Sequence, residues 1–563
     1  DVIDKACALV GDLDIAKLPV DDRKTYEMLA RGDSVGVFQF ESSGMREALR
    51  QVKPTEFEDL IALVALYRPG PMQYIPNYAN RKHGKEPVTF LDPRLKPILS
   101  GTYGISIYQE QSMEIAKQIA GFTPAEADDL RKAIGKKIHA LMASLKEKFL
   151  EGCAQSGTTP AVANQLWKDM ESSQDYSFNK AHAAAYALIA YRTAWLRANH
   201  PREYMAALIS SVMNTKDRVP FYVSACHELG IEVEPPDVNE SECDFAVVEG
   251  KIRFGLNAVK NVGDSAARRI VEARKSAPFT SLWDFTERVD PQVVNKRALE
   301  ALVKCGAFDS TGDSRKGMFD ALEQALGSGA ARQEALMFGQ ESMFEVEHPP
   351  IRGDEYEKNE LLRLEKETLG VYVSEHPLQA IREQLRRKTD APLAEVERRR
   401  DGEIVTVGGI VGAIKQLTTK KGEPMVFMRL DDLTGSTEIV VFNSVYGASR
   451  DLLEVDEVLV VKGRVDHKQE GETKLLAMEI TAFEATPERR QVVLKVDAAR
   501  APAGLVRDLA SVVKEFPGET PVLVAISTSQ GETTLALGPD YRVKPEPDFF
   551  AEVKSLLGEA AVV

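Results

Sequence analysis

The feature that most constrains the fold is a change in the hydrophobic period along the chain. Over roughly the first 400 residues, apolar residues recur at three- and four-residue spacing, as they do in amphipathic helices. From Glu403 apolar and polar residues alternate, as they do in half-buried strands. One architecture cannot satisfy both periods, so the pattern predicts a multidomain α+β protein that is largely α-helical in its first part.

Caps and breakers delimit the predicted elements. Thr123-Pro124 opens one helix with a capping box, Thr159-Pro160 opens another, and His200-Pro201 ends an alanine-rich helix over 181–199. Five short strands over about 80 residues favour a barrel of the OB type, and we place them at 404–414, 425–430, 438–442, 458–465 and 474–483. Strands and helices then alternate in the tail, which predicts a small α+β domain.

Five regions follow from these changes of pattern. The segment 310–350 carries Gly, Ser and Gln and is weakly periodic, so we expect a linker there. The predicted divisions are a helical region, a region of paired helical hairpins, a linker followed by charged helices, the barrel, and the tail domain, at residues 1–235, 236–310, 311–400, 401–486 and 487–563.

Charge and cysteine usage narrow the function classes. The formal net charge of −15 excludes a uniformly basic nucleic-acid coat protein. Residues 51–200 nevertheless hold 18 Lys and Arg against 15 Asp and Glu, which leaves room for a local basic groove. The five cysteines form no C-x-x-C pair, so we expect neither a disulfide framework nor a structural zinc site. We expect a cytoplasmic location instead. The chain opens at Asp1 without Met, which suggests a piece of a longer protein.

Four cations gather within seven residues at the end of the first capped helix: Arg131, Lys132, Lys136 and Lys137. Basic residues at a helix C-terminus favour the helix dipole and need no further role. The alternative is a triphosphate clamp, in which Arg supplies paired donors and Lys supplies point charges. Charge alone leaves both interpretations open.

Ordered motifs decide between them. The stretch 130–137 reads Leu-Arg-Lys-Ala-Ile-Gly-Lys-Lys, and further motifs occur at 36–42 (Gly-Val-Phe-Gln-Phe-Glu-Ser), 65–71 (Ala-Leu-Tyr-Arg-Pro-Gly-Pro), 108–111 (Tyr-Gln-Glu-Gln) and 178–186 (Phe-Asn-Lys-Ala-His-Ala-Ala-Ala-Tyr). Together these resemble the fingers of the C-family replicative DNA polymerases of bacteria, the alpha subunits of polymerase III. The resemblance continues through the hairpins, barrel and tail.

The resemblance implies a DNA-directed DNA polymerase in the complete enzyme, with residues 1–235 as fingers. It implies that Mg²⁺ is held by three palm aspartates in a P-D-F-D-x-D-F and a K-F-D-F-L-G-L motif, neither of which occurs in this sequence. We therefore expect this chain to be a C-terminal portion that is inactive alone, with no catalytic or metal-binding residue of its own. Asp128-Asp129 is a poor metal site, because neighbouring side chains on a helix diverge.

The resemblance also implies a set of residues that face the nucleotide. The set contains Arg68, Arg131, Lys132, Lys136, Lys137, Asn179, Lys180 and His182. A lone histidine in an alanine-rich helix more often serves packing, so His182 is the weaker member. The implied substrates are deoxynucleoside triphosphates and primer–template DNA.

Residues 254–274 resemble a helix-hairpin-helix, a motif that binds duplex DNA without reading its sequence. Gly263 lets the backbone approach closely, amides at the following helix can point at a phosphate, and Lys260 adds charge. In the barrel, Phe427 and Arg429 share one face of a strand and suit stacking and phosphate contact with single-stranded DNA. The alternative for Phe427 is a place in the barrel core or an interface.

Residues 340–344 (Gln-Glu-Ser-Met-Phe) resemble the family's internal motif for the sliding clamp, the beta subunit, with Gln340, Met343 and Phe344 as anchors. Leu336-Met337-Phe338 is an alternative register. The resemblance further implies contact with the clamp-loader tau subunit through the tail domain and with a proofreading exonuclease through the missing N-terminal part. Two rival functions stay open: the error-prone paralogue of the family, and a non-catalytic DNA-binding scaffold.

Overall fold

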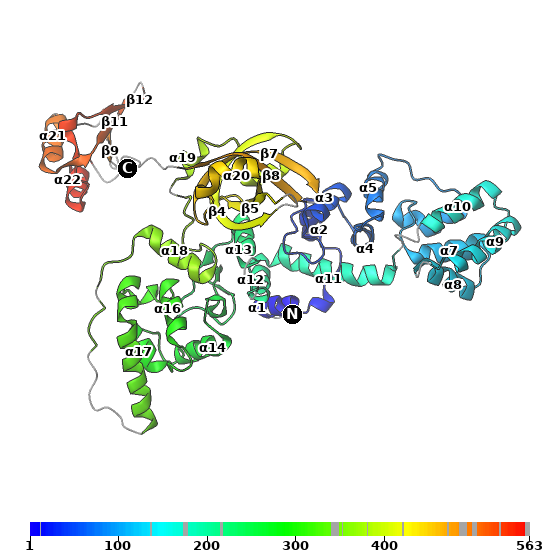
Figure 1. Cartoon of the computed structure of the whole chain (residues 1–563), viewed down its shortest axis with the longest axis horizontal. Helices are drawn as coiled ribbons and strands as arrows, with labels where there is room; N and C mark the ends of the chain where they lie inside the picture. Colours follow the sequence, from blue (N-terminus) through cyan, green and yellow to red (C-terminus); the bar gives the residue numbers. More distant parts are fainter. Residues whose placement is uncertain are drawn as a thin grey trace. The chain divides into compact units, whose positions relative to one another are not determined.

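The computed structural model divides the chain into two compact units, Asp1–Ala482 and Phe483–Val563 (Figure 1). It describes all residues except 12, 136–137, 173–177, 214, 216–217, 339–347, 352, 380, 419–421, 470–471, 484–491, 498–500, 502–503, 529–530 and 558–563. Within the described part, every helix is too short or too polar to cross a bilayer.

The first unit opens with a helical region organised around one long helix, α11 (Lys180–Asn199). Its inward face is lined by small residues and Tyr191, which let α4 pack closely against it. The surrounding helices are α1 (Val2–Val10), α2 (Arg23–Ala30), α3 (Ser43–Val52), α4 (Phe57–Leu66), α5 (Ile75–Lys82), α12 (Pro201–Ser211) and α13 (Arg218–Glu228). In Figure 1, α11 extends from beside α12 toward a second helical bundle.

That second bundle has its own core around Phe149 and Trp167. Its helices are α6 (Lys96–Leu99), α7 (Gln109–Ala120), α8 (Pro124–Gly135), α9 (His139–Gln155) and α10 (Pro160–Ser172). Gly152 permits the tight contact between α9 and α7, because a Cβ there would lie 1.9 Å from the Ala120 carbonyl oxygen. The helices predicted at the Thr-Pro caps are confirmed.

A small sheet leads into the hairpin region. Its strands are β1 (Val233–Glu234), β2 (Ala246–Val248) and β3 (Lys251–Arg253), in the order β1-β3-β2. The hairpin helices are α14 (Asp264–Ala273), α15 (Leu282–Arg288) and α16 (Lys296–Lys304). We call residues 254–274 the first hairpin and residues 282–304 the second hairpin.

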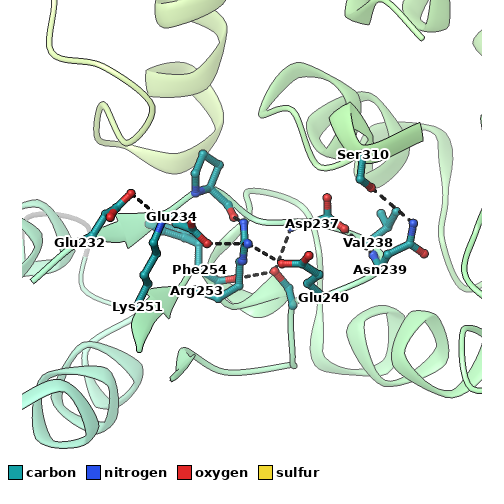
Figure 2. A network of polar contacts seen from close by, with 12 residues as sticks. Glu232, Glu234, Asp237, Val238, Asn239, Glu240, Lys251, Arg253, Phe254 and Ser310 are labelled. Carbon is teal, nitrogen blue, oxygen red and sulfur yellow. Dashed lines mark hydrogen bonds and ion pairs between the residues drawn. The ribbon is translucent and has the colours of Figure 1, made fainter. Parts of the chain in front are cut away.

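A polar network fixes the sheet against the loop that follows β1 (Figure 2). Arg253 pairs with Glu234 at 2.5 Å, also pairs with Glu240, and donates to the Pro235 carbonyl at 3.0 Å. Asn239 accepts from the Phe279 amide at 2.7 Å and donates to its carbonyl at 2.9 Å. The network thus ties the sheet to the hairpins that pack beside it.

The expected linker at 310–350 is wrong over much of its length, because α17 (Arg315–Met337) is a regular helix. Met318, Leu322 and Ala325 are buried in the core that the hairpins share. Gly329 allows α17 to approach α15, since a Cβ there would lie 2.3 Å from the Thr286 carbonyl oxygen. Tertiary packing therefore overrides the weak helical signal of a Gly-bearing segment. Beyond it lies α18 (Lys358–Leu369).

The predicted barrel is confirmed as a closed sheet in the order β4-β5-β6-β8-β7. Its strands are β4 (Ile404–Thr418), β5 (Pro424–Asp431), β6 (Ser436–Val441), β7 (Val458–Gln469) and β8 (Glu472–Ala482), with α19 (Arg382–Arg386) before it and α20 (Asn443–Ser449) between β6 and β7. The parallel pair of β6 and β8 closes the ring. Val426, Met428 and Leu430 of β5 point into the core, as their alternation predicts.

The second unit is a separate α+β domain. It contains β9 (Val492–Asp497), α21 (Leu505–Glu515), β10 (Pro517–Thr520), β11 (Val522–Thr528), β12 (Gly531–Ala536) and α22 (Pro547–Leu557). The sheet order is β12-β11-β9, and β9 pairs in parallel with β11 through the α21 crossover. Its core includes Leu494, Val513 and Phe549.

Candidate functional site

The N-terminus of α11 is the centre of the candidate site. Asn179 caps the helix, and its side-chain oxygen accepts from the His182 amide at 2.8 Å. Glu110 of α7 accepts from the Asn179 side-chain amide at 2.8 Å and from the Lys180 backbone amide at 3.0 and 3.1 Å. A carboxylate at a helix N-terminus is favoured by the helix dipole. Glu110 thus locks the start of α11 onto α7.

Backbone hydrogen bonds extend this lock. The Phe178 amide donates to the Ile107 carbonyl at 3.1 Å, and the Gln109 amide donates to the Phe178 carbonyl at 3.0 Å. Gln111 is nearly buried, and its side-chain oxygen accepts from the amides of Ile107 and Tyr108. The motifs at 108–111 and 178–186 are therefore one structural piece, although about 70 residues separate them in sequence.

Two cations lie against aromatic rings at this point. The Arg68 guanidinium lies 4.2 Å from the centre of the Phe178 ring, and its Nε donates to the Ala65 carbonyl at 2.9 Å. Burial lowers the pKa of Arg68 below its ordinary value. The Lys180 ammonium lies 5.5 Å from the centre of the Tyr108 ring. The structure thus brings Arg68, from the motif at 65–71, together with Lys180 and His182, from the motif at 178–186.

A series of aromatic rings begins at Phe178, beside Arg68, and follows α11. His182 lies 5.3 Å from Phe178 and stacks on Tyr186 at 4.6 Å with an interplanar angle of 29°. Phe38, from the motif at 36–42, lies 5.7 Å from Tyr186. We call Phe178, His182, Tyr186 and Phe38 the aromatic row. His182 is exposed within it and packs on two rings.

The surroundings of Arg131 and Lys132 on α8 are different, because each of these cations pairs with an acidic side chain on the same helix. Arg131 contacts Asp128 at 2.9 Å, while Lys132 contacts Asp128 at 3.0 Å and Asp129 at 3.2 Å. Hydrogen bonds from Lys132 and then Arg131 lower the pKa of Asp128. Lys136 and Lys137 lie outside the described residues.

Asp128 and Asp129 hold cationic side chains, so they do not fit a Mg²⁺ site. In the described ranges, the His, Cys, Asp and Glu side chains form no cluster of three or more that could hold a metal ion. The donor set that Mg²⁺ prefers, several oxygen ligands around one point, is thus not offered by these residues.

The first hairpin presents an open helix start. Gly263 is the N-cap of α14, is exposed, and has no atom within 4 Å of the place where a Cβ would stand. The Lys260 side chain is exposed, and its backbone amide donates to the Thr368 carbonyl at 3.0 Å. In the second hairpin the N-cap is Asn295, whose side chain accepts from the Ala298 amide at 3.1 Å. Of these two helix starts, only the first has no side-chain hydrogen bond at its cap, which leaves its first amides open to a phosphate.

On the barrel, Phe427 and Arg429 lie on the outer face of β5, and Phe427 is not part of the barrel core. Arg429 pairs with Asp431 at 3.0 Å, so its charge is partly satisfied within the strand. The Lys474 ammonium lies 5.5 Å from the Phe427 ring centre. Sequence reasoning missed Lys474, because only the parallel pairing of β6 with β8 brings it to this face.

Two further groups of residues complete the comparison with the sequence-based expectation. Gln340, Met343 and Phe344, the residues predicted to bind the clamp, lie outside the described residues. Glu110, Tyr108, Tyr186 and Phe38 were missed as site residues, although all four stand inside quoted motifs. No single motif indicates that these four side chains lie together at α11, because the fold brings them there from separate parts of the sequence.

Three families of known proteins match separate segments of the chain. The description "Bacterial DNA polymerase III alpha subunit finger domain" matches residues 1–157. A helix-hairpin-helix motif matches residues 230–318, and an OB-fold nucleic acid binding domain matches residues 405–485. These ranges contain α7 and α8, the two hairpins, and the barrel respectively.

Curated relatives match nearly the whole chain. The DNA polymerase III subunit alpha of Thermus aquaticus is 43% identical over 93% of this chain and 44% of its own length. Those of Saccharopolyspora erythraea and Mycobacterium tuberculosis are 40% and 38% identical over 97% and 99% of this chain, and 48% and 49% of their own lengths. The chain therefore spans about half the length of the curated relatives it matches. Together the three domain matches and these relatives show that the chain belongs to the bacterial DNA polymerase III alpha subunit family.

Proposed function

We propose that this chain supplies the nucleotide-binding fingers and the DNA-binding C-terminal region of a bacterial replicative polymerase, whose complete form carries out template-directed nucleotidyl transfer in the cytoplasm. One observation carries the proposal: Arg68 and His182 both contact Phe178 beside Lys180 at the start of α11, and Glu110 fixes that helix start through the Lys180 amide. A scaffold without nucleotide chemistry has no use for this convergence of cations and aromatic rings.

In this proposal the triphosphate is taken by cations of α8. Arg131 and Lys132 are half-exposed, and their partners are acids on the same helix that an incoming anion can replace. Exposed ion pairs at this spacing contribute little to stability, because solvent screens them. Lys136 and Lys137 follow directly in sequence and add to the same positive stretch. Arg68 and the aromatic rings beside it orient the nucleotide from α11.

DNA contacts are proposed for the first hairpin and the barrel. The open cap at Gly263 and the exposed Lys260 suit a phosphate of duplex DNA. Phe427, with Lys474 beside it, suits a single strand. Both interactions ignore base sequence, so binding by the chain should be insensitive to sequence and should fall steeply with salt.

The reaction needs a divalent metal, Mg²⁺ in our proposal, and no group of acidic side chains in the described part of the chain is placed to hold one. We place the metal-binding aspartates in the part of the family's polypeptide that this chain does not span. When bound, the metal would stabilise charge on the attacking and leaving oxygens. This chain's own residues would bind the triphosphate and hold the single-stranded and duplex DNA.

The test is a pair of assays on the purified chain. It should bind primer–template DNA in a salt-dependent, sequence-independent manner and should fail to extend the primer with Mg²⁺ and all four nucleotides. Primer extension by the chain alone would show that it has catalytic carboxylates. Binding that ignores salt, or strongly prefers one sequence, would contradict phosphate contact.

The partners proposed for the complete polymerase are the sliding clamp, the tau subunit and a proofreading exonuclease. For the clamp, Met343 and Phe344 would fill an apolar pocket while Gln340 fixes orientation. A peptide covering 336–348 should bind the clamp, and replacing Met343 and Phe344 by Ala should abolish binding. A double variant that still synthesises processively in the complete polymerase would show that the clamp is held elsewhere.

A further inference from the structure

We propose that the aromatic row is a stacking track for the unpaired bases of single-stranded DNA. The proposal rests on the proposed function and deepens it, because it assigns Phe38 and Tyr186 to the site and names a strand, in addition to a nucleotide, as their ligand. The row joins Phe178 and His182 to Tyr186 and Phe38 with successive ring separations of 5.3, 4.6 and 5.7 Å.

The loop that carries Phe38 is built to hold it outward. Val37 and Phe40 on either side of the tip are fully buried, while Phe38 is 38% exposed. The Phe38 amide donates to Thr193 Oγ1 of α11 at 3.2 Å, and Ser34 Oγ donates to the Phe40 carbonyl at 2.6 Å. A fixed, exposed aromatic ring gives up little conformational entropy when a ligand covers it, so its burial adds to affinity.

Gly36 shows how tightly the loop is packed. Its φ is +79°, and a Cβ there would stand 2.6 Å from Leu208 Cδ2. Its carbonyl accepts from the Tyr204 hydroxyl at 2.7 Å. Gln39, directly after Phe38, also adopts a positive φ, +63°. The tip therefore has little freedom to fold Phe38 into the interior.

The neighbouring face of α11 continues the same surface. Ile189 is 39% exposed and stands three positions after Tyr186, on the same side of the helix. Ala181 and Ala185 are exposed and precede Ile189 at four-residue spacing, so they lie on the same side of the helix. Their small side chains leave space for sugars and phosphates to approach the helix.

Charge and ring chemistry favour a single strand over an apolar protein partner. Arg68 lies at the Phe178 end of the row, and Lys180 is the first residue of α11, two positions before His182. Cations flanking exposed rings provide phosphate contacts beside stacking contacts, which is how sequence-tolerant single-strand sites are built. Unstacked bases fit this site because every base has a face that an aromatic ring can cover.

The experiment uses the full 563-residue chain with Phe427→Ala and Lys474→Ala, so that the barrel does not mask the row. Its affinity is measured for two short single strands of equal length, one with bases and one abasic. Phosphates are the same in both, so the ratio of the two affinities reports base contacts alone. Phe38→Ala, Tyr186→Ala and the conservative Tyr186→Phe are compared with Phe221→Ala, an aromatic of α13 that is 47% exposed and outside the row.

We expect Phe38→Ala and Tyr186→Ala each to lower the affinity for the base-containing strand by about tenfold and to leave the abasic strand unaffected. Tyr186→Phe and Phe221→Ala should change neither affinity. Thermal unfolding of each variant establishes that the fold is kept. We expect Phe38→Ala to disturb the fold least, because the Phe38 ring is exposed.

An unchanged ratio in both alanine variants would overturn the proposal, as would equal losses for the two strands. If a free deoxynucleoside triphosphate removes all base-dependent binding, the row holds the incoming nucleotide and the strand assignment is wrong. Failure of the proposed function looks different: the chain would then bind neither strand and no duplex.

Discussion

Arg131 and Lys132 on α8 and Lys180 on α11 are all cations of the helical region that precedes β1, but their surroundings differ in origin. The α8 cations pair with Asp128 and Asp129, three or four residues away on one exposed helix. The Lys180 backbone is held by Glu110 from α7, and its ammonium lies over Tyr108. One group is assembled by local sequence and the other by the tertiary fold.

This difference in surroundings indicates different roles for the α8 cations and the α11 group. Local, solvent-exposed pairs are weak and screened by salt, so their cations are available to an anion that arrives. The α11 group is fixed by several hydrogen bonds between remote segments before any ligand binds. We therefore expect α8 to contribute charge and α11 to contribute geometry.

The largest effect should follow from Glu110→Ala in the complete polymerase. The change removes three hydrogen bonds to a charged group, each worth about 1.5–3 kcal/mol at most, and frees the start of α11. We expect kcat/KM for nucleotide to fall by about 30- to 100-fold. The matched control is Glu114→Ala, also on α7, which pairs only with neighbours on its own helix. Equal losses in both variants would remove the distinction between the two groups.

A smaller effect is expected from Arg131→Ala and from Lys136→Ala. Loss of one charge-assisted bond to a triphosphate should raise the nucleotide KM and lower kcat, together by about tenfold, with primer–template affinity unchanged. Lys148→Ala is the control, because Lys148 of α9 pairs with Glu126 nearby on α8. Unchanged nucleotide kinetics with lowered folding stability would assign Arg131 and Lys136 to the helix end alone.

The smallest effect tests whether the local acids compete with the ligand. Asp128→Asn frees Arg131 and releases one of the two contacts of Lys132, so the nucleotide KM should fall by about two- to threefold, and more at low salt than at high salt. Asp129→Asn, which releases only one contact of Lys132, should change KM less. A KM that rises in Asp128→Asn would mean that Asp128 positions the cations for the ligand.

Much of the local structure could be predicted from the sequence. Alternation correctly separated Val426, Met428 and Leu430 of β5 from Phe427 and Arg429, because a strand's two faces depend only on position parity; that Phe427 lies outside the core was decided by the structure. Capping residues located α8 and α10 for a similar reason, since a cap acts within one helical turn. The ordered motifs gave the family.

What the sequence left open depends on distant contacts. Glu110 and Phe38 stand in quoted motifs, but nothing in either motif indicates that both meet α11. Lys474 reaches Phe427 only through barrel closure. The helix α17 was missed because its stability comes from burial against the hairpins and not from propensity.

The closed barrel also bears on aggregation. A strand at the edge of an open sheet exposes backbone donors and acceptors that can recruit another chain, whereas β4, β5, β6, β8 and β7 each have a partner on both sides. The sheet of the second unit is open, with β12 and β9 at its edges. The exposed charge of Lys495 on β9 opposes pairing with a foreign strand. Self-association at high concentration should therefore begin at β12, the other edge of this sheet, and not at the barrel.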